Sequence, residues 1–401
     1  MIETVARRIE GDKVFLNQIK EKILELADFL VKIQYATDLR KGWYGGFPSI
    51  EGGVFYYTID GCFAIDALLD AYEFSGRRTY LDTARRAGSF LRHMQTRHEA
   101  DLVDKYYGGF CEYVRSDTEA YLTRMHTKNL LAVSALNKLY GITTNSLYAT
   151  MRDDALSFLR YGLENYYHYY NPLPYGDNAW HREGIPETNI LADDFSYALR
   201  SVYEYEGLTT AVRNIYNFLQ SISTPNYNPR FAWAGYLNVV DKIPAVDYYD
   251  VVTSGLLKDI RSKIDVESYR FSIDKLVELG SKAFYWGLKF NWEPVDRWQN
   301  TATVSSIGLY LIEAKKNYPE ALKYVLKHAP YIRYDPKTNE YDPVFGRTPG
   351  GASEDVLRFL KAAHTNMVRA HAVWMVSFLI GAAIPILFIL GVIGASELIK
   401  R

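Results

Sequence analysis

Acidic side chains stand near aromatic ones at several places in this 401-residue chain. Aromatic rings stack on the C–H faces of sugars, and carboxylates hold sugar hydroxyl groups, so the combination indicates carbohydrate chemistry. Glycoside hydrolysis needs two carboxyl groups across the scissile bond, about 5.5 Å apart for retention and roughly 6.5–9.5 Å apart for inversion. We predict Asp60 and Asp194 as the catalytic pair, with Asp193 as the substitute.

The residues predicted to bind substrate share a position in a loop or at a helix start. They are Trp43, Tyr44, Tyr107, Glu112, His126, Trp180 and His181. Several candidates also fit a structural role. Acids such as Asp60, Asp193 and Asp194 are favourable in the first turn of a helix, where they meet free N–H groups and the helix dipole. His126 would equally serve as a hydrogen-bonded core histidine.

Composition and motifs exclude several other classes of protein. The net charge is -1, which gives no global field for nucleic acid, and we expect no nucleic-acid partner. Cys62 and Cys111 are the only two cysteines, too few for a zinc cluster of cysteines or a disulfide framework. Nucleotide-binding, zinc-protease and serine-hydrolase motifs do not occur in the sequence. We therefore expect no metal site and no cofactor.

The elements that would position the candidate residues form a repeat. Three segments begin with Ala-Leu, contain a Tyr five residues after that Ala and end with Gly: 67–76, 135–141 and 198–207. The sequence Tyr-Gly-Gly-Phe occurs at 44–47 and again at 107–110. With a period of about 65 residues, each unit reads as a loop, an apolar helix and a more amphipathic helix. Glycine permits turns that other residues resist, so we expect these loops to be structural first.

Hydrophobic periodicity extends this pattern over most of the chain. It predicts helices at about 14–34, 57–74, 79–95, 123–140, 146–166, 188–206, 208–222, 245–263, 268–289, 298–316 and 318–329. Strand-like alternation is scarce. The sequence therefore predicts an all-α domain of about six helical hairpins.

This hairpin rhythm, with the segment LADDFSYALRSVYEY at 191–205, resembles the (α/α)6 toroids of the six-hairpin glycosidase-like group, which includes N-acylglucosamine 2-epimerases and several glycoside hydrolases. The Tyr-Gly-Gly-Phe loops also resemble those of terpenoid cyclase and protein prenyltransferase toroids. The chain lacks the D-x-D-D motif and the zinc ligands of that second group. The resemblance covers residues 15–330. It implies a toroid whose inner helices point their N-terminal ends at a central cavity.

The end of the chain predicts a membrane anchor. Residues 372–396 contain no charged side chain, and this stretch exceeds the roughly 20 residues that a helix needs to cross a bilayer. Ser353-Glu-Asp reads as a helix start, and the apolar spacing after it would lead one helix into the membrane. We expect a toroid at 1–330, a linker at 331–352 and an amphipathic-to-transmembrane helix at 353–401. The N-terminus lacks the apolar core of a signal peptide, so we expect a single-pass protein with a cytoplasmic domain.

Three functions fit this sequence. The first is a membrane-anchored glycoside hydrolase or sugar epimerase acting through carboxylates in the central cavity, on a glycan or a lipid-linked glycan. The second is a non-catalytic scaffold whose tail helix joins membrane-protein partners. The third is an isoprenoid or lipid enzyme of the cyclase or transferase type. A cavity with facing carboxylates favours the first function, a filled centre the second and a cavity lined by Phe and Leu the third.

Overall fold

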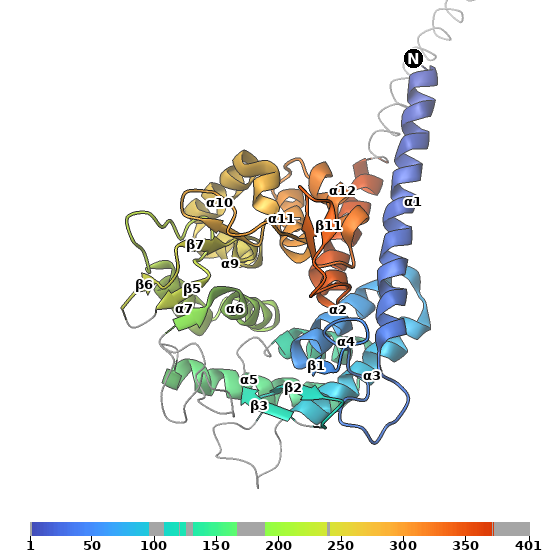
Figure 1. Cartoon of the computed structure of the whole chain (residues 1–401), viewed down its shortest axis with the longest axis vertical. Coiled ribbons are helices and arrows are strands. Elements are labelled where there is room, and N and C mark those ends of the chain that lie inside the picture. Colours follow the sequence, from blue (N-terminus) through green and yellow to red (C-terminus); the bar gives the residue numbers. More distant parts are fainter. Residues whose placement is uncertain are drawn as a thin grey trace, which may run out of the picture.

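The computed structural model describes residues 2–95, 108–119, 121–125, 131–166, 189–238, 241–370 and 372. Within these ranges, six helices form an inner ring in which sequential neighbours contact one another (Figure 1). They are α2 (Thr58–Ser75), α4 (Ala132–Thr143), α6 (Ala192–Glu206), α8 (Val252–Leu256), α11 (Thr301–Glu313) and the helix of residues 354–370. The short helix η5 (Gly350–Ala352) contacts both α11 and α2 and thereby closes the ring.

Each inner helix is paired with an outer one, which makes six hairpins of the described residues. The outer helices are α3 (Arg78–Met94), α5 (Ser146–Tyr166), α7 (Thr210–Gln220), α9 (Lys258–Ile264) with α10 (Val266–Leu279), and α12 (Pro319–His328). The sixth outer helix is α1 (Ile2–Ile33), which lies beside the helix of residues 354–370 (Figure 1). The predicted all-α toroid of about six hairpins is thus confirmed.

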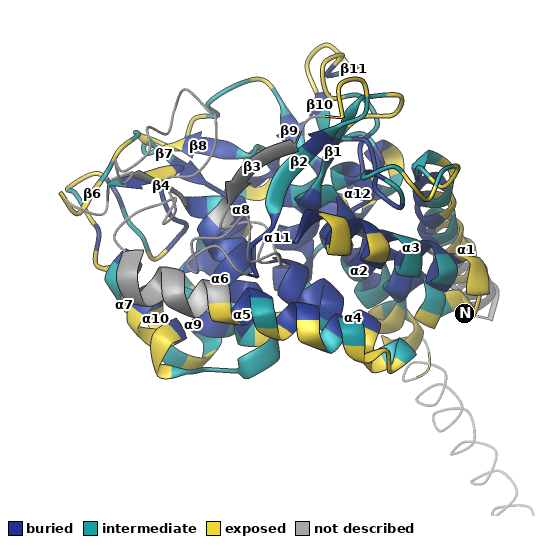
Figure 2. Cartoon of the chain, turned by 90° about the horizontal axis from the view of Figure 1, so that it is seen from below, coloured by how far each residue is buried: buried dark blue, intermediate teal, exposed yellow. Residues whose placement is uncertain are grey.

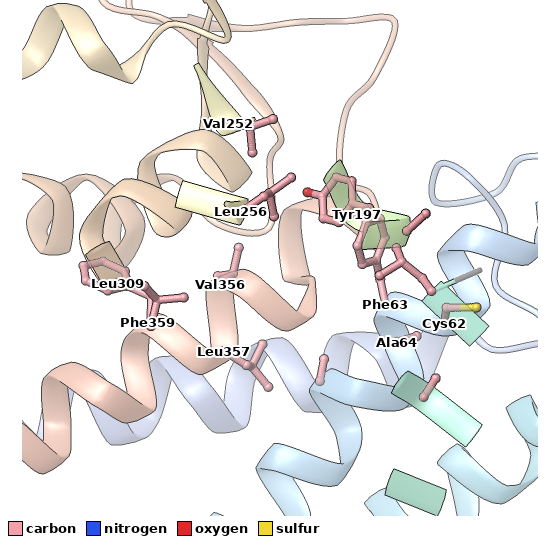
Figure 3. Packing of buried hydrophobic residues seen from close by; sticks show 14 of the residues in the cluster. Cys62, Phe63, Ala64, Tyr197, Val252, Leu256, Leu309, Val356, Leu357 and Phe359 are labelled. Atoms are coloured by element: carbon pink, nitrogen blue, oxygen red, sulfur yellow. The ribbon is translucent and has the colours of Figure 1, made fainter. Parts of the chain in front are cut away.

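The inner and outer helices differ in their apolar patterns. Buried residues occur on every side of α2, as is typical of a helix enclosed by others (Figure 2). In contrast, α3 and α7 each bury one face. Small residues allow the inner helices to approach closely. A Cβ at Gly308 of α11 would lie 2.4 Å from the ring of Phe359. At this point α11 packs against the helix of residues 354–370 (Figure 3).

Short antiparallel strands lead into four of the inner helices. The sheets are β1 (Phe55–Tyr57), β2 (Cys111–Arg115) and β3 (Tyr121–Met125); β4 (Asn189–Leu191), β5 (Tyr236–Asn238) and β6 (Ile243–Pro244); β7 (Tyr248–Asp250) and β8 (Gly287–Lys289); and β9 (Gln299–Asn300), β10 (Arg333–Asp335) and β11 (Glu340–Tyr341). β1, β4 and β9 end directly before α2, α6 and α11 begin, and one residue separates β7 from α8. The strands therefore fix the residues at the N-terminal ends of those helices.

These strands explain where the predicted helix boundaries are wrong. The helix predicted from about 245 begins at Val252, because β7 occupies 248–250. The helix predicted from about 123 begins at Ala132, because β3 ends at Met125. The helix predicted to reach 289 ends at Leu279. Gly280 follows with a positive φ of 54°, and the 3-10 helix η4 (Gly280–Phe284) leads into β8.

The two Tyr-Gly-Gly-Phe loops share one set of contacts, which accounts for their sequence. Gly45 has a φ of 82° and Gly108 a φ of 87°. Each glycine carbonyl accepts a hydrogen bond from a buried glutamine: Gln34 Nε2 at 2.9 Å and Gln95 Nε2 at 3.0 Å. The same glutamines bond to carbonyls of the following outer helices, at Thr83 O and at Met151 O. The loops thus fasten each hairpin to the next.

Residues that the sequence assigned to a linker and a tail helix lie against the ring. β10 and β11 pair within 331–352, and Tyr334 is buried. In the helix of residues 354–370, Val356, Phe359, Leu360 and Ala363 are buried, at the spacing expected from the sequence. The ring of His364 packs edge-on against Phe74 of α2, with centroids 5.1 Å apart.

The predicted localisation as a single-pass membrane protein requires correction. No helix in the described ranges has the length and apolar character needed to cross a bilayer. The predicted span, residues 372–396, lies outside the described residues apart from Ala372. The membrane anchor, and the membrane and membrane-protein partners that depended on it, are therefore not retained.

Candidate functional site

A cavity of about 340 Å³ opens at the N-terminal ends of the inner helices. Its described wall comes from α2, α6, α8 and α11, from the strands β5, β7, β9 and β10 and from the start of the last inner helix. The wall residues include Phe63, Asp193, Tyr197, Tyr236, Tyr248, Asp250, Trp286, Asn300, Thr303, Arg333 and Ser353. This volume lies within the usual range of small-molecule sites, roughly 300–1,000 Å³.

One side of the cavity carries two carboxylates. Asp193 stands in the first turn of α6, and Asp250 ends β7 just before α8, with only 7% of its surface exposed. Both carboxylates act on Tyr248. The pKa of the Tyr248 phenol is raised to about 12, first by burial, then by the charge of Asp250, with a contribution from Asp193. Tyr248 is therefore a neutral hydrogen-bond donor within electrostatic reach of both acids. The absence of a side chain at Gly235 allows this, because a Cβ there would lie 2.2 Å from the Tyr248 ring.

The other side carries neutral hydrogen-bonding groups and one cation. Asn300 caps α11 by accepting a hydrogen bond from Thr303 N at 3.0 Å. Arg333 of β10 is opposite Asn300 in the strand register and lies 3.5 Å from Asp342. Ser353 closes this side at the start of the last inner helix. The two walls of the cavity therefore differ in charge.

Aromatic rings line the cavity between these walls. Phe63 and Tyr197 meet edge to face with centroids 5.3 Å apart (Figure 3). Trp286 is held by a hydrogen bond from its Nε1 to Asp296 Oδ2 at 2.7 Å, and Tyr248 packs against it edge-on at 5.3 Å. Fixed rings beside carboxylates are what stacking on a sugar requires.

A buried ion network lies inside the ring and reaches the cavity through Tyr197. Tyr197 Oη donates to Asp355 at 3.3 Å, and Arg200 bonds to Asp355 at 2.7 Å and to Glu354 at 3.1 Å. Arg358 pairs with both Glu354 and Glu204. These partners come from α6 and the last inner helix, so the network joins elements that are about 150 residues apart in sequence.

The charges of this network balance only if one acid is neutral. Among the described residues, four carboxyl groups face three cations: Asp66, Glu204, Glu354 and Asp355 against Lys138, Arg200 and Arg358. Burial and the nearby charge of Glu354 raise the pKa of Asp66 well above its usual range, although Lys138 lies 3.1 Å away. Burial would raise the pKa of Glu354. The cations around Glu354 and a hydrogen bond from Asp66 outweigh burial and lower this pKa. Asp66 is the neutral member.

The free energy of unfolding of the Asp66→Asn variant should therefore increase relative to that of the wild type as the pH rises. A carboxyl group with a raised folded-state pKa binds more protons folded than unfolded, so its stability contribution falls as pH rises from about 4 towards that pKa. Asparagine mimics the neutral acid without titrating, and the difference should grow by about 1.4 kcal/mol per pH unit in this window. Urea unfolding between about pH 5 and pH 7 measures it, with the exposed Asp274→Asn on α10 as the control. A constant difference across pH would contradict a neutral Asp66.

Of the predicted pair Asp60 and Asp194 and the substitute Asp193, the structure describes the side chains of Asp60 and Asp193. Asp60 stands in the first turn of α2, where it and Glu112 of β2 both act on Tyr57, whose pKa rises to about 12 through burial first and then these charges. Asp193 lines the cavity, and Asp60 and Glu112 are not among the described residues of its wall. The backbone of Asp194 lies in α6, and its side chain lies outside the described residues.

Among the aromatic residues and histidines predicted to bind substrate, two are described, and neither lines this cavity. Trp43 is buried and packs against Tyr35, with centroids 5.8 Å apart, and against Tyr56 at 6.4 Å. Tyr44 is half-buried and lines a separate hollow beside α3 and α5. Four other candidates lie outside the described residues: Tyr107, His126, Trp180 and His181.

The sequence interpretation missed Asp250, Tyr248 and Trp286. Asp250 fell inside a predicted helix, which hid its position at a helix start. One signal would have found it: a Tyr-Tyr pair at 56–57 stands just before α2, and a second pair at 248–249 stands just before Asp250 and α8. The repeat therefore extends into the second half of the chain at this point.

Comparison with known proteins identifies the fold. No family model matches the chain, and no curated protein matches its sequence. Solved structures match over nearly their whole length. Cellobiose 2-epimerase of Bacillus thermoamylovorans matches with a TM-score of 0.65 and 13% identity, covering 88% of this chain and 99% of that one. A D-mannose isomerase matches with a TM-score of 0.61 and 13% identity, covering 89% and 98%.

A glycoside hydrolase gives a weaker match. It is an inactive variant of an α-1,6-mannanase of Salegentibacter, in which two consecutive aspartates are replaced by alanine, in complex with α-1,6-mannotetrose. The TM-score is 0.50 and the identity 13%, with 87% of this chain and 99% of that one covered. At such low identity these similarities establish the fold and not the reaction. The chain therefore has the fold of the six-hairpin (α/α)6 toroids, which include sugar epimerases and glycoside hydrolases.

Proposed function

We propose that the protein is a carbohydrate-active enzyme that binds a sugar in the central cavity and acts on it through the carboxylates of Asp193 and Asp250. The observation that carries this proposal is the pair of acids at adjacent inner-helix starts, set among fixed aromatic rings. A scaffold filled by its own side chains would not leave such a cavity. A lipid cyclase would be expected to line it with apolar residues alone.

Hydrolysis of a glycosidic bond is the first candidate reaction. One carboxyl group would give its proton to the leaving oxygen as the bond from that oxygen to the anomeric carbon breaks. The other carboxylate would either attack the anomeric carbon or activate the water that does so, and the water oxygen ends on that carbon. Asp194 remains a proposed contributor beside Asp193. Consecutive aspartates are also the residues replaced in the inactive mannanase variant.

Epimerisation of a sugar is the second candidate, and the neighbours with the higher TM-scores favour it. In that reaction a base removes the proton next to the sugar carbonyl, and the proton returns to the opposite face. Reaction in D2O distinguishes the two candidates. Epimerisation would exchange the proton at C2 for deuterium, whereas hydrolysis would release a new reducing end without that exchange.

We expect Asp193→Asn and Asp250→Asn each to lower turnover by about 10²- to 10⁴-fold, the usual contribution of a positioned acid or base. The assay follows reducing disaccharides, including cellobiose, and nitrophenyl glycosides by NMR. Asp274→Asn, on the exposed face of α10, is the matched control and should keep wild-type turnover. Full turnover in both cavity variants would refute the assignment, and no turnover of any sugar by the wild type would refute the proposed function.

A further inference from the structure

The hydroxyl of Ser353 is a buried polar group with no hydrogen-bond partner among the described residues. Its residue is only 2% exposed, and it lies on the cavity wall. Leaving a buried donor or acceptor unsatisfied costs about 1–3 kcal/mol. A partner supplied by the contents of the cavity would remove that cost.

Ser353 stands where a serine ordinarily caps a helix. The helix of residues 354–370 begins directly after it, and Leu357 N bonds to the Ser353 carbonyl at 3.0 Å. A capping side chain accepts a hydrogen bond from an N–H of the first turn. Elsewhere Thr209, Asp265 and Asn300 do so, at 3.2, 3.1 and 3.0 Å. The Ser353 hydroxyl does not cap its helix, so its position is not explained by helix stability.

The neighbouring groups place further donors beside this hydroxyl. The first N–H groups of an α-helix have no partner within the helix, and here they follow Ser353 directly. Gly350, also on the cavity wall, packs so closely on Ile332, the residue before β10, that a Cβ there would lie 3.1 Å from the Ile332 side chain. This packing holds the start of the last inner helix against the cavity.

The charges around the cavity indicate what kind of sugar group this wall accepts. Asp193 and Asp250 line the opposite side, and Arg333, the cation of the described wall, is already paired with Asp342. An anionic ligand would be repelled by these two carboxylates. A neutral hydroxyl group both donates and accepts, so it suits a serine hydroxyl.

We propose that Ser353 is a substrate-binding residue whose hydroxyl hydrogen-bonds a hydroxyl group of an uncharged sugar. This inference rests on the proposed function, because it requires that the cavity takes a sugar. It adds the residue that contacts the sugar on the wall opposite the acids, and it selects neutral sugars over sugar acids.

The test compares the full chain with two serine or threonine variants by thermal unfolding, alone and with glucose, xylose, cellobiose or glucuronate. Ser353→Ala should leave the Tm without sugar unchanged or slightly higher, because it removes an unsatisfied hydroxyl. It should weaken binding of the stabilising neutral sugar by about tenfold. Thr209→Ala is the matched control, because Thr209 does cap its helix outside the cavity. It should lower the Tm and keep the sugar response of the wild type.

Each other outcome overturns a different statement. An unchanged sugar response in Ser353→Ala means that the hydroxyl binds only solvent, and a fall in Tm like that of Thr209→Ala means that it serves the helix. Stabilisation by glucuronate above that by the neutral sugars overturns the substrate class. If none of the four sugars stabilises the wild type, the proposed function fails, and this inference fails with it.

Discussion

Replacing Gly45 by alanine is expected to lower the free energy of unfolding by about 3–5 kcal/mol. Two costs add up. The φ of 82° is one that residues with a Cβ rarely adopt. The new Cβ would also lie 1.9 Å from the carbonyl oxygen of Arg86, a backbone atom that moves only if α3 shifts. Gly108→Ala should behave alike, because its Cβ would lie 2.1 Å from Asp154 O on α5.

Gly52→Ala is the control that separates these costs. Gly52 has nearly the same φ, 80°, but a Cβ there would meet nothing within 4 Å. It should cost only the backbone term of about 1–2 kcal/mol. Urea unfolding of the three variants measures the difference. Equal losses at Gly45 and Gly52 would show that the close approach to α3 contributes nothing.

Replacing Arg200 by methionine is expected to cost about 3–5 kcal/mol of stability. Methionine fills a similar volume but leaves Asp355 and Glu354 with fewer cations in a buried site. The attraction of these carboxylates outweighs the effect of burial and raises the pKa of Arg200 above its ordinary value, so the side chain is charged in the wild type. Loss of one partner leaves a buried charge uncompensated, which costs more than the pair itself contributes.

Two comparisons make this prediction specific. Adding Asp355→Asn to Arg200→Met should restore part of the lost stability, because it removes one of the stranded charges. Arg115→Met breaks a surface pair with Asp117 at 2.7 Å, in which both side chains are about 40% exposed. That variant should lose less than about 1 kcal/mol. A similar loss in Arg115→Met and Arg200→Met would mean that burial does not strengthen the central network.

The parts of the fold that the sequence could predict are those governed by local patterns. The repeating helices, the Gly-Gly turns and the helix start at Ser353-Glu-Asp each follow from residues close together in the chain. The helix start at Val252 was misplaced, because β7 before it pairs with β8, about 40 residues further along the chain. The start at Ala132 was misplaced because β3 before it pairs with β2. Local periodicity does not record such partners.

The sequence predicted the types of residue at the candidate site but not most of the individual residues on the cavity wall. Acids beside aromatic residues pointed to carbohydrate chemistry, and Asp193 lies on the cavity wall. Asp250 joins it because α6 and α8 pack against each other, although the two acids are 57 residues apart in sequence. The ion network shows the same limit. Asp66 is a lone acid in the apolar segment 62–69 of α2, which signals a buried carboxyl group, but its partners Lys138 and Glu354 come from elements distant in sequence.

The closing hairpin of the ring is made from the two ends of the described chain, with α1 as its outer helix and residues 354–370 as its inner one. During synthesis, five hairpins can therefore form before the last inner helix emerges. α1 also contacts α2 and α3, but its hairpin partner lies more than 300 residues away. Until then, the apolar sides of α2 and α11 stay uncovered, and the cavity has its acidic wall without the wall that holds Ser353. A nascent chain or a fragment that stops before residue 353 would be prone to aggregation, and the proposed function predicts that it would not bind sugar until the ring is complete.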